Sequence, residues 1–304
     1  MPRIAYVNGR YVEHAAATVH IEDRGYQLAD GVYEVCEVLN GRLVDERRHM
    51  ARLKRSLGEL QIRWPMNPSA LAVVMREVVR RNRIGDGIVY LQVTRGVAPR
   101  DHAFPKPEVP PALVITAREM PMEPRLKRAE RGVTVVTAPD NRWGRVDIKT
   151  VGLLPNVLAK EAGHTAGAYE TWFVDRDGFV TEGASTNAWI VSAGGALMTR
   201  PADHGILWGV TRGVLLDVVR GEGIRLEERA FSLAEALKAK EAFLTSATNA
   251  VMPIVKIDGK AIGDGKPGPV SKRLRQARLA AVEVSPLRAG PTIAGEAAGE
   301  AGAA

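Results

Sequence analysis

Two Asn-Gly pairs near the start of the chain restrict what this sequence can form. Asn8-Gly9 lies within 6–12 and Asn40-Gly41 within 38–44, and both pairs are flanked by alternating apolar residues. Asn-Gly is the strongest short-range signal for a two-residue hairpin, because both central residues of that turn need a positive φ. The pattern therefore predicts antiparallel strands in residues 1–44.

Helical and strand-like spacings continue through the rest of the chain. Helical spacing covers 46–60, 69–82, 210–220 and 271–283, and strand-like runs cover 87–94, 112–117, 132–138, 171–174, 179–181, 187–191, 196–199, 225–228 and 242–245. Asp258-Gly259 predicts a last hairpin. A chain of 304 residues with 45% hydrophobic content is long enough for two cores. We therefore expect an α+β fold of two domains.

The segment 119–124 is the expected boundary between these domains, because it has two prolines and no hydrophobic periodicity. The predicted division places a small αβ domain at 1–118, the linker at 119–124 and a larger domain at 125–285. From Pro286 onward the chain is mostly Gly, Ala and Glu, so residues 286–304 are expected to be disordered.

Charge and cysteine content argue against several classes of function. The net charge of +7 is scattered and only 5% of the residues are aromatic, whereas a nucleic-acid binder would show a basic stripe with stacking aromatics. The single cysteine, Cys36, allows no disulfide framework, and the six histidines show no metal-ligand spacing. No signal peptide or membrane-spanning apolar run is visible. We expect a soluble, cytoplasmic protein with no metal site and no nucleic-acid or membrane partner.

Residues 145–162 contain the first candidate for chemistry. Their pattern predicts a short extended segment at 146–150 that runs into a helix with one apolar face, formed by Leu154, Val157, Leu158 and Ala162. Lys149 lies on or just after the extended segment. Apolar neighbours there could remove water from its amine and lower its pKa, as a Schiff-base lysine requires. Judged on this stretch alone, an exposed edge-strand lysine is the commoner alternative.

Three further polar segments follow apolar runs. Glu182 ends a hairpin strand and is followed by small residues up to Asn187, and 245–249 is a hydroxyl-rich turn. The glycine-punctuated turn 205–209 leads into a helix, whose free N–H groups suit a phosphate. Dinucleotide-binding, Walker A and kinase motifs are missing. Each segment taken singly is more often a turn or a cap than a site.

In this order, these segments resemble the class IV (fold type IV) pyridoxal-phosphate aminotransferases, which include D-amino-acid and branched-chain enzymes. The resemblance spans residues 4–283 and implies a small αβ N-terminal domain with a larger C-terminal pseudo-barrel domain. It rests on Asp23-Arg24-Gly25-Tyr26-Gln27, Asp30-Gly31-Val32-Tyr33-Glu34, His49-Met50-Ala51-Arg52-Leu53, Asp147-Ile148-Lys149, Glu182-Gly183 with Asn187, and Gly205-Ile206-Leu207 with Gly209-Val210-Thr211-Arg212.

The resemblance implies a role for each matched position. Lys149 would form the Schiff base with pyridoxal 5′-phosphate and move the substrate Cα proton, while Glu182 would keep the pyridine nitrogen protonated. Arg52 would bind the phosphate, whereas its neighbours Arg48 and Arg55 are expected to be solvated. The remaining expected cofactor-binding residues are Asn187, Leu207 against the ring, Val210 and Thr211 at the helix start, and Ser246, Ala247 and Thr248 in the turn.

The proline-rich loop 95–111 indicates the subfamily. Arg100 and His102 resemble the pair that, with an early-strand tyrosine, here Tyr33, binds the α-carboxylate in D-amino-acid transaminases. Guanidinium is a bidentate carboxylate receptor, and His and Tyr add directed donors. The resemblance also implies a homodimer in which loop 96–105 completes the neighbour's site. Exposure of Arg100 and His102 as ordinary loop residues is the alternative.

The implied reaction is a ping-pong transamination between a D-amino acid and a 2-oxo acid, 2-oxoglutarate or pyruvate. A branched-chain L-aminotransferase, an aminodeoxychorismate lyase and an (R)-selective amine transaminase remain alternatives on the same fold. A non-catalytic binding protein that kept the fold is an alternative of another class. It need not form a Schiff base, so an absorbance band near the visible edge would argue against it.

Overall fold

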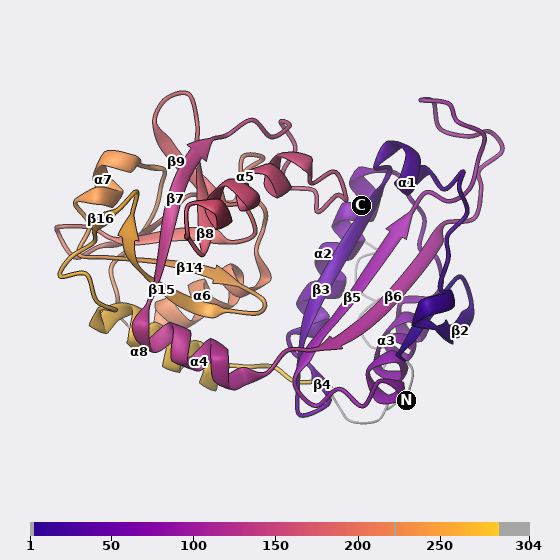
Figure 1. Cartoon of the computed structure of the whole chain (residues 1–304), viewed down its shortest axis with the longest axis horizontal. Coiled ribbons are helices and arrows are strands. Elements are labelled where there is room, and N and C mark those ends of the chain that lie inside the picture. The colour runs from indigo at the N-terminus through magenta and orange to yellow at the C-terminus, as the bar shows by residue number, and fades with distance from the viewer. Residues whose placement is uncertain (1–2, 222, 286–304) are drawn as a thin grey trace, which may run out of the picture.

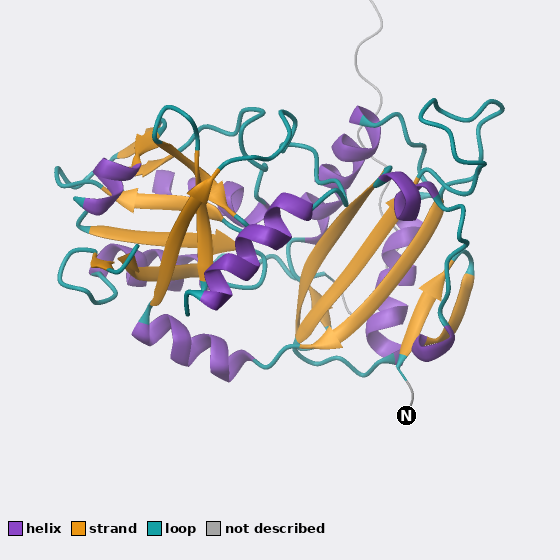
Figure 2. Ribbon diagram, turned by 45° about the horizontal axis from the view of Figure 1, so that its top comes forward, coloured by secondary structure: helices purple, strands orange, loops and turns teal. Residues whose placement is uncertain are grey.

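The computed structural model describes residues 3–221 and 223–285, and its strands form two sheets that lie side by side (Figures 1 and 2). Helices cover both sheets, so the α+β expectation is confirmed. The predicted disordered tail, 286–304, lies outside the described residues. No helix of the described part of the chain is long and apolar enough to cross a membrane.

The first sheet is antiparallel throughout, with strand order β2-β1-β6-β5-β3-β4. Both Asn-Gly turns form as predicted: φ is 44° and 95° at Asn8 and Gly9, and 49° and 74° at Asn40 and Gly41. The strands are β1 (Ile4–Val7), β2 (Arg10–Glu13), β3 (Gly31–Leu39), β4 (Arg42–Leu43), β5 (Gly87–Thr94) and β6 (Ala112–Glu119).

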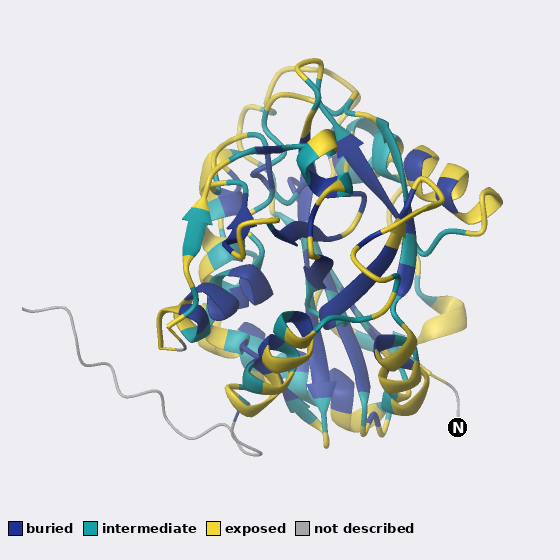
Figure 3. Ribbon diagram, turned by 90° about the vertical axis from the view of Figure 1, so that its left-hand side faces the viewer, coloured by how far each residue is buried: buried dark blue, intermediate teal, exposed yellow. Residues whose placement is uncertain are grey.

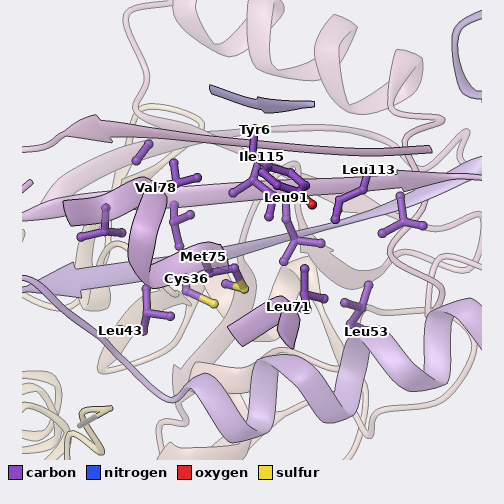
Figure 4. Close-up of a cluster of buried hydrophobic side chains, with 14 of the residues drawn as sticks. Tyr6, Cys36, Leu43, Leu53, Leu71, Met75, Val78, Leu91, Leu113 and Ile115 are labelled. Atoms are coloured by element: carbon purple, nitrogen blue, oxygen red, sulfur yellow. The ribbon is translucent and has the colours of Figure 1, made fainter. Parts of the chain in front are cut away.

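Two helices, α2 (Glu46–Glu59) and α3 (Pro68–Arg81), pack on this sheet and enclose the first core. Leu53 from α2 and Leu71 and Met75 from α3 point toward the strands (Figure 4). The N-terminus of α3 is capped by the Asn67 side chain, which accepts from the Ser69 amide. Two short elements precede β3: a 3₁₀ turn, η1 (His14–Ala16), and α1 (Arg24–Leu28), capped by Asp23.

The second sheet has ten strands and mixes parallel and antiparallel pairs, in the order β12-β11-β10-β14-β15-β7-β8-β9-β13 with β16 paired to β15. Two separate apolar cores pack against it, and both sheets are mostly buried while the outer loops are exposed (Figure 3). The strands are β7 (Val133–Pro139), β8 (Glu170–Val174), β9 (Phe179–Gly183), β10 (Asn187–Val191), β11 (Leu197–Thr199), β12 (Leu226–Glu228), β13 (Phe231–Ser232), β14 (Glu241–Ser246), β15 (Ala250–Ile257) and β16 (Lys260–Ala261).

The helices of this half are α4 (Met122–Arg131), α5 (Leu154–Thr165), α6 (Val210–Gly221), α7 (Leu233–Leu237) and α8 (Pro269–Ala280). The sequence reasoning missed α4, which begins inside the predicted linker 119–124. The helix buries only Arg125 and Ala129, and six of its ten residues are charged, so few apolar residues mark it in the sequence. The division into domains at 1–118 and 125–285 stays our proposal.

The expectation of a short extended segment before Lys149 is wrong. Val146 and Asp147 end a turn, Ile148 lies in a bend, and within 146–150 only Thr150 makes an isolated bridge, to Val32. The predicted helix forms as α5, and its apolar face points outward: Leu154, Val157 and Leu158 are 68%, 58% and 59% exposed, and Ala162 is also exposed. The helix buries its small residues, because at Gly163 a Cβ would come within 2.4 Å of Thr171 Oγ1.

Candidate active site

A cavity of about 890 Å³ lies between the two halves and gathers side chains from both. Of the thirteen residues that the sequence singled out, all but Arg100 line it. Those residues are Tyr33, Arg52, His102, Lys149, Glu182, Asn187, Leu207, Val210, Thr211, Ser246, Ala247 and Thr248. Segments more than 200 residues apart in the chain, such as β3 and the turn after β14, therefore meet around one space.

Lys149 is held against β3 through its backbone. Its carbonyl accepts from the Tyr33 amide at 3.0 Å, and its amide donates to Ser56 Oγ at 3.3 Å. The amine, Nζ, lies 4.1 Å from the centre of the Tyr33 ring and makes no ion pair with any described carboxylate. An amine fixed at its base and free at its tip can act as a nucleophile and carry a proton.

The turn before Lys149 is tied to helix α2, which corrects the expectation that Arg55 is solvated. Arg55 pairs with the fully buried carboxylate of Asp147 and donates to the Asp147 carbonyl at 3.0 Å. Arg145 pairs with the same carboxylate at 3.0 Å. The Arg55 guanidinium also lies 4.2 Å from the centre of the Trp208 ring. Arg55 therefore connects α2, the Lys149 turn and the 205–209 turn.

Glu182, at the end of β9, presents a fixed and buried carboxylate. Asn187 Nδ2 donates to Oε2 at 2.9 Å, the Leu207 amide donates to Oε1 at 3.0 Å, and Arg142 pairs with Oε1. Asp140 holds Arg142 from its other side at 2.7 Å. Burial raises the pKa of Glu182 and Arg142 opposes that rise. A cationic ring nitrogen in the cavity would favour the ionised carboxylate further.

Arg52 is oriented by a buried carboxylate that sequence reasoning did not assign to the site. Its Nε and Nη2 donate to the two oxygens of Glu34 at 2.7 and 2.8 Å, and its Nη1 donates to the Trp208 carbonyl at 3.0 Å. His49 Nδ1 lies 2.8 Å from the same Glu34. Burial acts to raise the pKa of Glu34, but Arg52 and His49 lower it overall. Two of the five guanidinium N–H groups remain for an anion.

The start of helix α6, next to the Trp208 carbonyl that Arg52 binds, also suits a phosphate. The first amides of a helix have no intrahelical partner and favour negative charge. Thr211 is buried, and its Oγ1 has no hydrogen-bond partner within the described structure. At Gly209 a Cβ would come within 1.9 Å of Asn187 Oδ1, so only glycine leads into this helix without displacing Asn187. An orphaned buried hydroxyl and free amides fit the phosphate of pyridoxal phosphate.

The loop with Arg100 and His102 is anchored at its base. Arg24 donates to the carbonyls of Asp101 and His102 at 2.6 and 3.4 Å, and Arg95 lies 3.5 Å from the centre of the Phe104 ring. His102 and Phe104 reach the edge of this chain's own cavity, while Arg100 is exposed outside it. A single chain thus brings His102 and Tyr33 to one cavity but leaves Arg100 away from it.

Sequence reasoning missed Arg142, Asp140, Glu34 and Arg55 as supports of the site. Of these, only Glu34 could have been found from the sequence, because it lies inside a motif that carries the resemblance. The same holds for its neighbour His49. The spacing of His49 and Arg52, one helical turn apart, places both on one face toward Glu34. In residues 3–221 and 223–285, no cluster of His, Cys, Asp and Glu side chains could hold a metal ion.

Comparison with known proteins gives a consistent match. The sequence model of amino-transferase class IV matches residues 31–257. The D-alanine aminotransferase of Bacillus licheniformis is 41% identical over 270 residues, covering 89% of this chain and 94% of that protein. The D-alanine aminotransferase of Staphylococcus haemolyticus is 39% identical over 271 residues, covering 89% of this chain and 95% of that protein.

Solved structures show the same fold. The branched-chain amino acid aminotransferase of Escherichia coli superposes with a TM-score of 0.84 at 23% identity, covering 92% of this chain and 95% of that one. A hypothetical aminotransferase from Mycobacterium tuberculosis, in its PLP-bound form, superposes with a TM-score of 0.79 at 21% identity, covering 91% of this chain and 98% of that one.

Proposed function

Because this chain belongs to the class IV aminotransferases, we propose that it transfers an amino group between a D-amino acid and a 2-oxo acid, in two half-reactions at one site. The cofactor is pyridoxal 5′-phosphate. The observation that carries the proposal is the convergence of Lys149, Glu182 and the start of α6 on one cavity, although they lie in three separate segments. The curated relatives named D-alanine aminotransferase favour a D-amino acid as substrate.

Each side chain has a proposed task. When bound, pyridoxal phosphate supplies an electron sink for the bond broken at the substrate Cα. Lys149 would take the proton from the substrate Cα and deliver it to C4′ of the cofactor on the same face, because its backbone is fixed beside Tyr33. Glu182 holds a proton at the pyridine nitrogen, and Leu207 packs against the ring. Arg52, the amides of Val210 and Thr211, and the turn with Ser246, Ala247 and Thr248 bind the phosphate.

Substrate recognition requires a second copy of this chain. We propose a homodimer in which loop 96–105 of one subunit completes the carboxylate site of the other, with Arg100 and His102 beside Tyr33. The position of Arg100 outside its own cavity supports this arrangement, although His102 lines the cavity of its own chain. Exposed apolar side chains that a second copy would cover also support the homodimer: Ile21, Tyr26, Trp143, Leu154, Val157 and Leu158, of which Trp143 and Val157 line the cavity. The free, buried thiol of Cys36 suits a reducing cytoplasm.

A coupled assay tests this function. D-alanine and L-leucine are offered separately to the purified protein, with 2-oxoglutarate and added pyridoxal phosphate. We expect turnover of D-alanine alone, and no turnover by Lys149→Ala, whose folding is checked by its melting temperature. Turnover of L-leucine alone would contradict the substrate. No turnover of either would contradict the reaction and favour the lyase or amine alternatives.

A further inference from the structure

Two arginines outside the cavity hold the turn between β14 and β15, residues 246–249. Arg125 on α4 donates to the Thr248 carbonyl at 2.7 Å. Arg275 on α8 donates to the carbonyls of Asn249 and Val251 at 2.7 and 2.6 Å. Neither arginine lines the cavity, whereas Thr248 and Asn249 do. The turn is therefore held from the side opposite the proposed phosphate.

Arg125 also connects this turn to the other side of the site. It is 5% exposed and pairs with Glu37 on β3, the strand that carries Tyr33 and the Arg52 partner Glu34. Burial raises the pKa of Glu37, and Arg125 opposes that rise. A rigid, planar guanidinium that bonds both a carboxylate and a carbonyl fixes the distance between them. Arg125 thus links the two sheets at the phosphate end of the cavity.

The charges behind the turn do not cancel. Two guanidinium groups, Arg125 and Arg275, face one carboxylate, Glu37. The neighbouring Arg278 and Asp45 pair with each other, so one positive charge remains in excess. Burial and the neighbouring Arg125 cation lower the pKa of Arg275, as expected for a cation that is bonded only to carbonyls. Charges in a partly buried region interact more strongly than in water. This excess charge favours a dianion bound on the inner side of the turn.

We propose that Arg125 and Arg275 are positioning residues that make the site selective for the phosphorylated cofactor. They fix the β14–β15 turn and place a positive charge behind it, and neither contacts the cofactor. The inference rests on the proposed binding of the phosphate by Ser246, Ala247 and Thr248. It adds that residues on α4 and α8 position this turn for that binding.

The test compares two probes, pyridoxal phosphate and pyridoxal, which differ only in the phosphate. Their dissociation constants are measured on the full chain after cofactor removal, by titration of tryptophan fluorescence. Removing Arg125 alone would leave Glu37 buried without a cation, which is strongly destabilising. We therefore use the double variant Glu37→Gln/Arg125→Met. Arg275→Met, which leaves no carboxylate unpaired, is the second variant. Matched controls are Arg131→Met on α4 and Lys272→Met on α8, both exposed.

We expect each test variant to bind pyridoxal phosphate about tenfold more weakly than its control, while pyridoxal binding changes by less than about threefold. Equal pyridoxal phosphate affinity in test and control variants would overturn the inference. So would equal weakening of both probes, because that result indicates general disruption. If the unmodified protein binds both probes equally, the proposed phosphate site itself is wrong and the inference is wrong with it.

Discussion

Asn187 Nδ2 lies 2.9 Å from Glu182 Oε2, and the same nitrogen donates to the Leu207 carbonyl at 3.0 Å. The other carboxylate oxygen accepts from the Leu207 amide. Asn187 and Leu207 therefore each bind one oxygen of Glu182 and are also hydrogen-bonded to each other. These bonds fix the plane of the carboxylate before a cofactor binds. Fixed dipoles and charges stabilise a reacting centre without reorganisation, which is the condition for large electrostatic effects in enzymes.

Glu182→Gln keeps the size of the side chain and removes its charge, although its NH2 group cannot accept from one of the donors that hold the carboxylate. We expect kcat to fall by about a hundredfold or more, because a neutral amide does not hold a proton at the ring nitrogen. The measurement is kcat with D-alanine at saturating pyridoxal phosphate. Asp177→Asn, an exposed carboxylate in the β8–β9 turn, is the control. A Glu182→Gln enzyme as active as the control would contradict the role of Glu182.

Arg100→Ala removes the proposed carboxylate receptor. Loss of a charge-assisted hydrogen bond is worth about 1.5–3 kcal/mol, so KM for D-alanine should rise roughly tenfold to a hundredfold. KM for an amine without a carboxylate should change little, and Lys106→Ala in the same loop serves as the control. The two substrates responding alike to Arg100→Ala would argue against the receptor.

Arg55→Met removes the bond between α2 and the turn that carries Lys149. Because a displacement of about 1 Å can cost roughly a hundredfold in rate, we expect kcat to fall between about tenfold and a hundredfold, with a smaller change in KM. Arg48→Met, on the same helix, removes a half-exposed pair with Asp217 and should leave kcat unchanged. If both variants lower kcat equally, Arg55 has no special connection to Lys149.

The pair of Glu34 with Arg52 predicts a loss of stability in acid. The folded-state pKa of Glu34 lies below its ordinary value of 4.5, so its contribution is present above about pH 4.5 and is lost as the pH falls below it. Glu34→Gln should be less stable at neutral pH by about 3 kcal/mol, because it breaks a buried ion pair. Its melting temperature should also fall less steeply between about pH 5 and pH 3. A slope equal to that of the unmodified protein would show that Glu34 does not titrate in this range.

The sequence predicts local structure well where one residue type determines the backbone conformation. The turns at Asn8-Gly9 and Asn40-Gly41 form as expected, because a positive φ depends on near neighbours alone. The predicted cofactor-binding residues also meet at one cavity, but that prediction came from the resemblance. Spacing by itself left Lys149 and Glu182 as ordinary surface residues.

The failures have a common physical reason: each depends on a distant partner. The spacing of apolar residues correctly predicted that α5 has an apolar face. That face is exposed in the single chain, because α5 buries only Ala159 and Gly163. Arg55 has the sequence context of a solvated arginine, and its partner Asp147 lies 92 residues away. Hydrophobic periodicity describes one helix or strand at a time. It therefore identifies neither the surface that packs against α5 nor the residue that pairs with Arg55.

The cavity between the two sheets has a thermodynamic consequence. A cofactor bound there contacts both halves, so its binding energy opposes their separation as well as the unfolding of either one. By linkage, a free cofactor concentration one hundred times the dissociation constant stabilises the folded chain by about 2.7 kcal/mol. Cofactor supply in the cell would then set the lifetime of the enzyme as well as its rate.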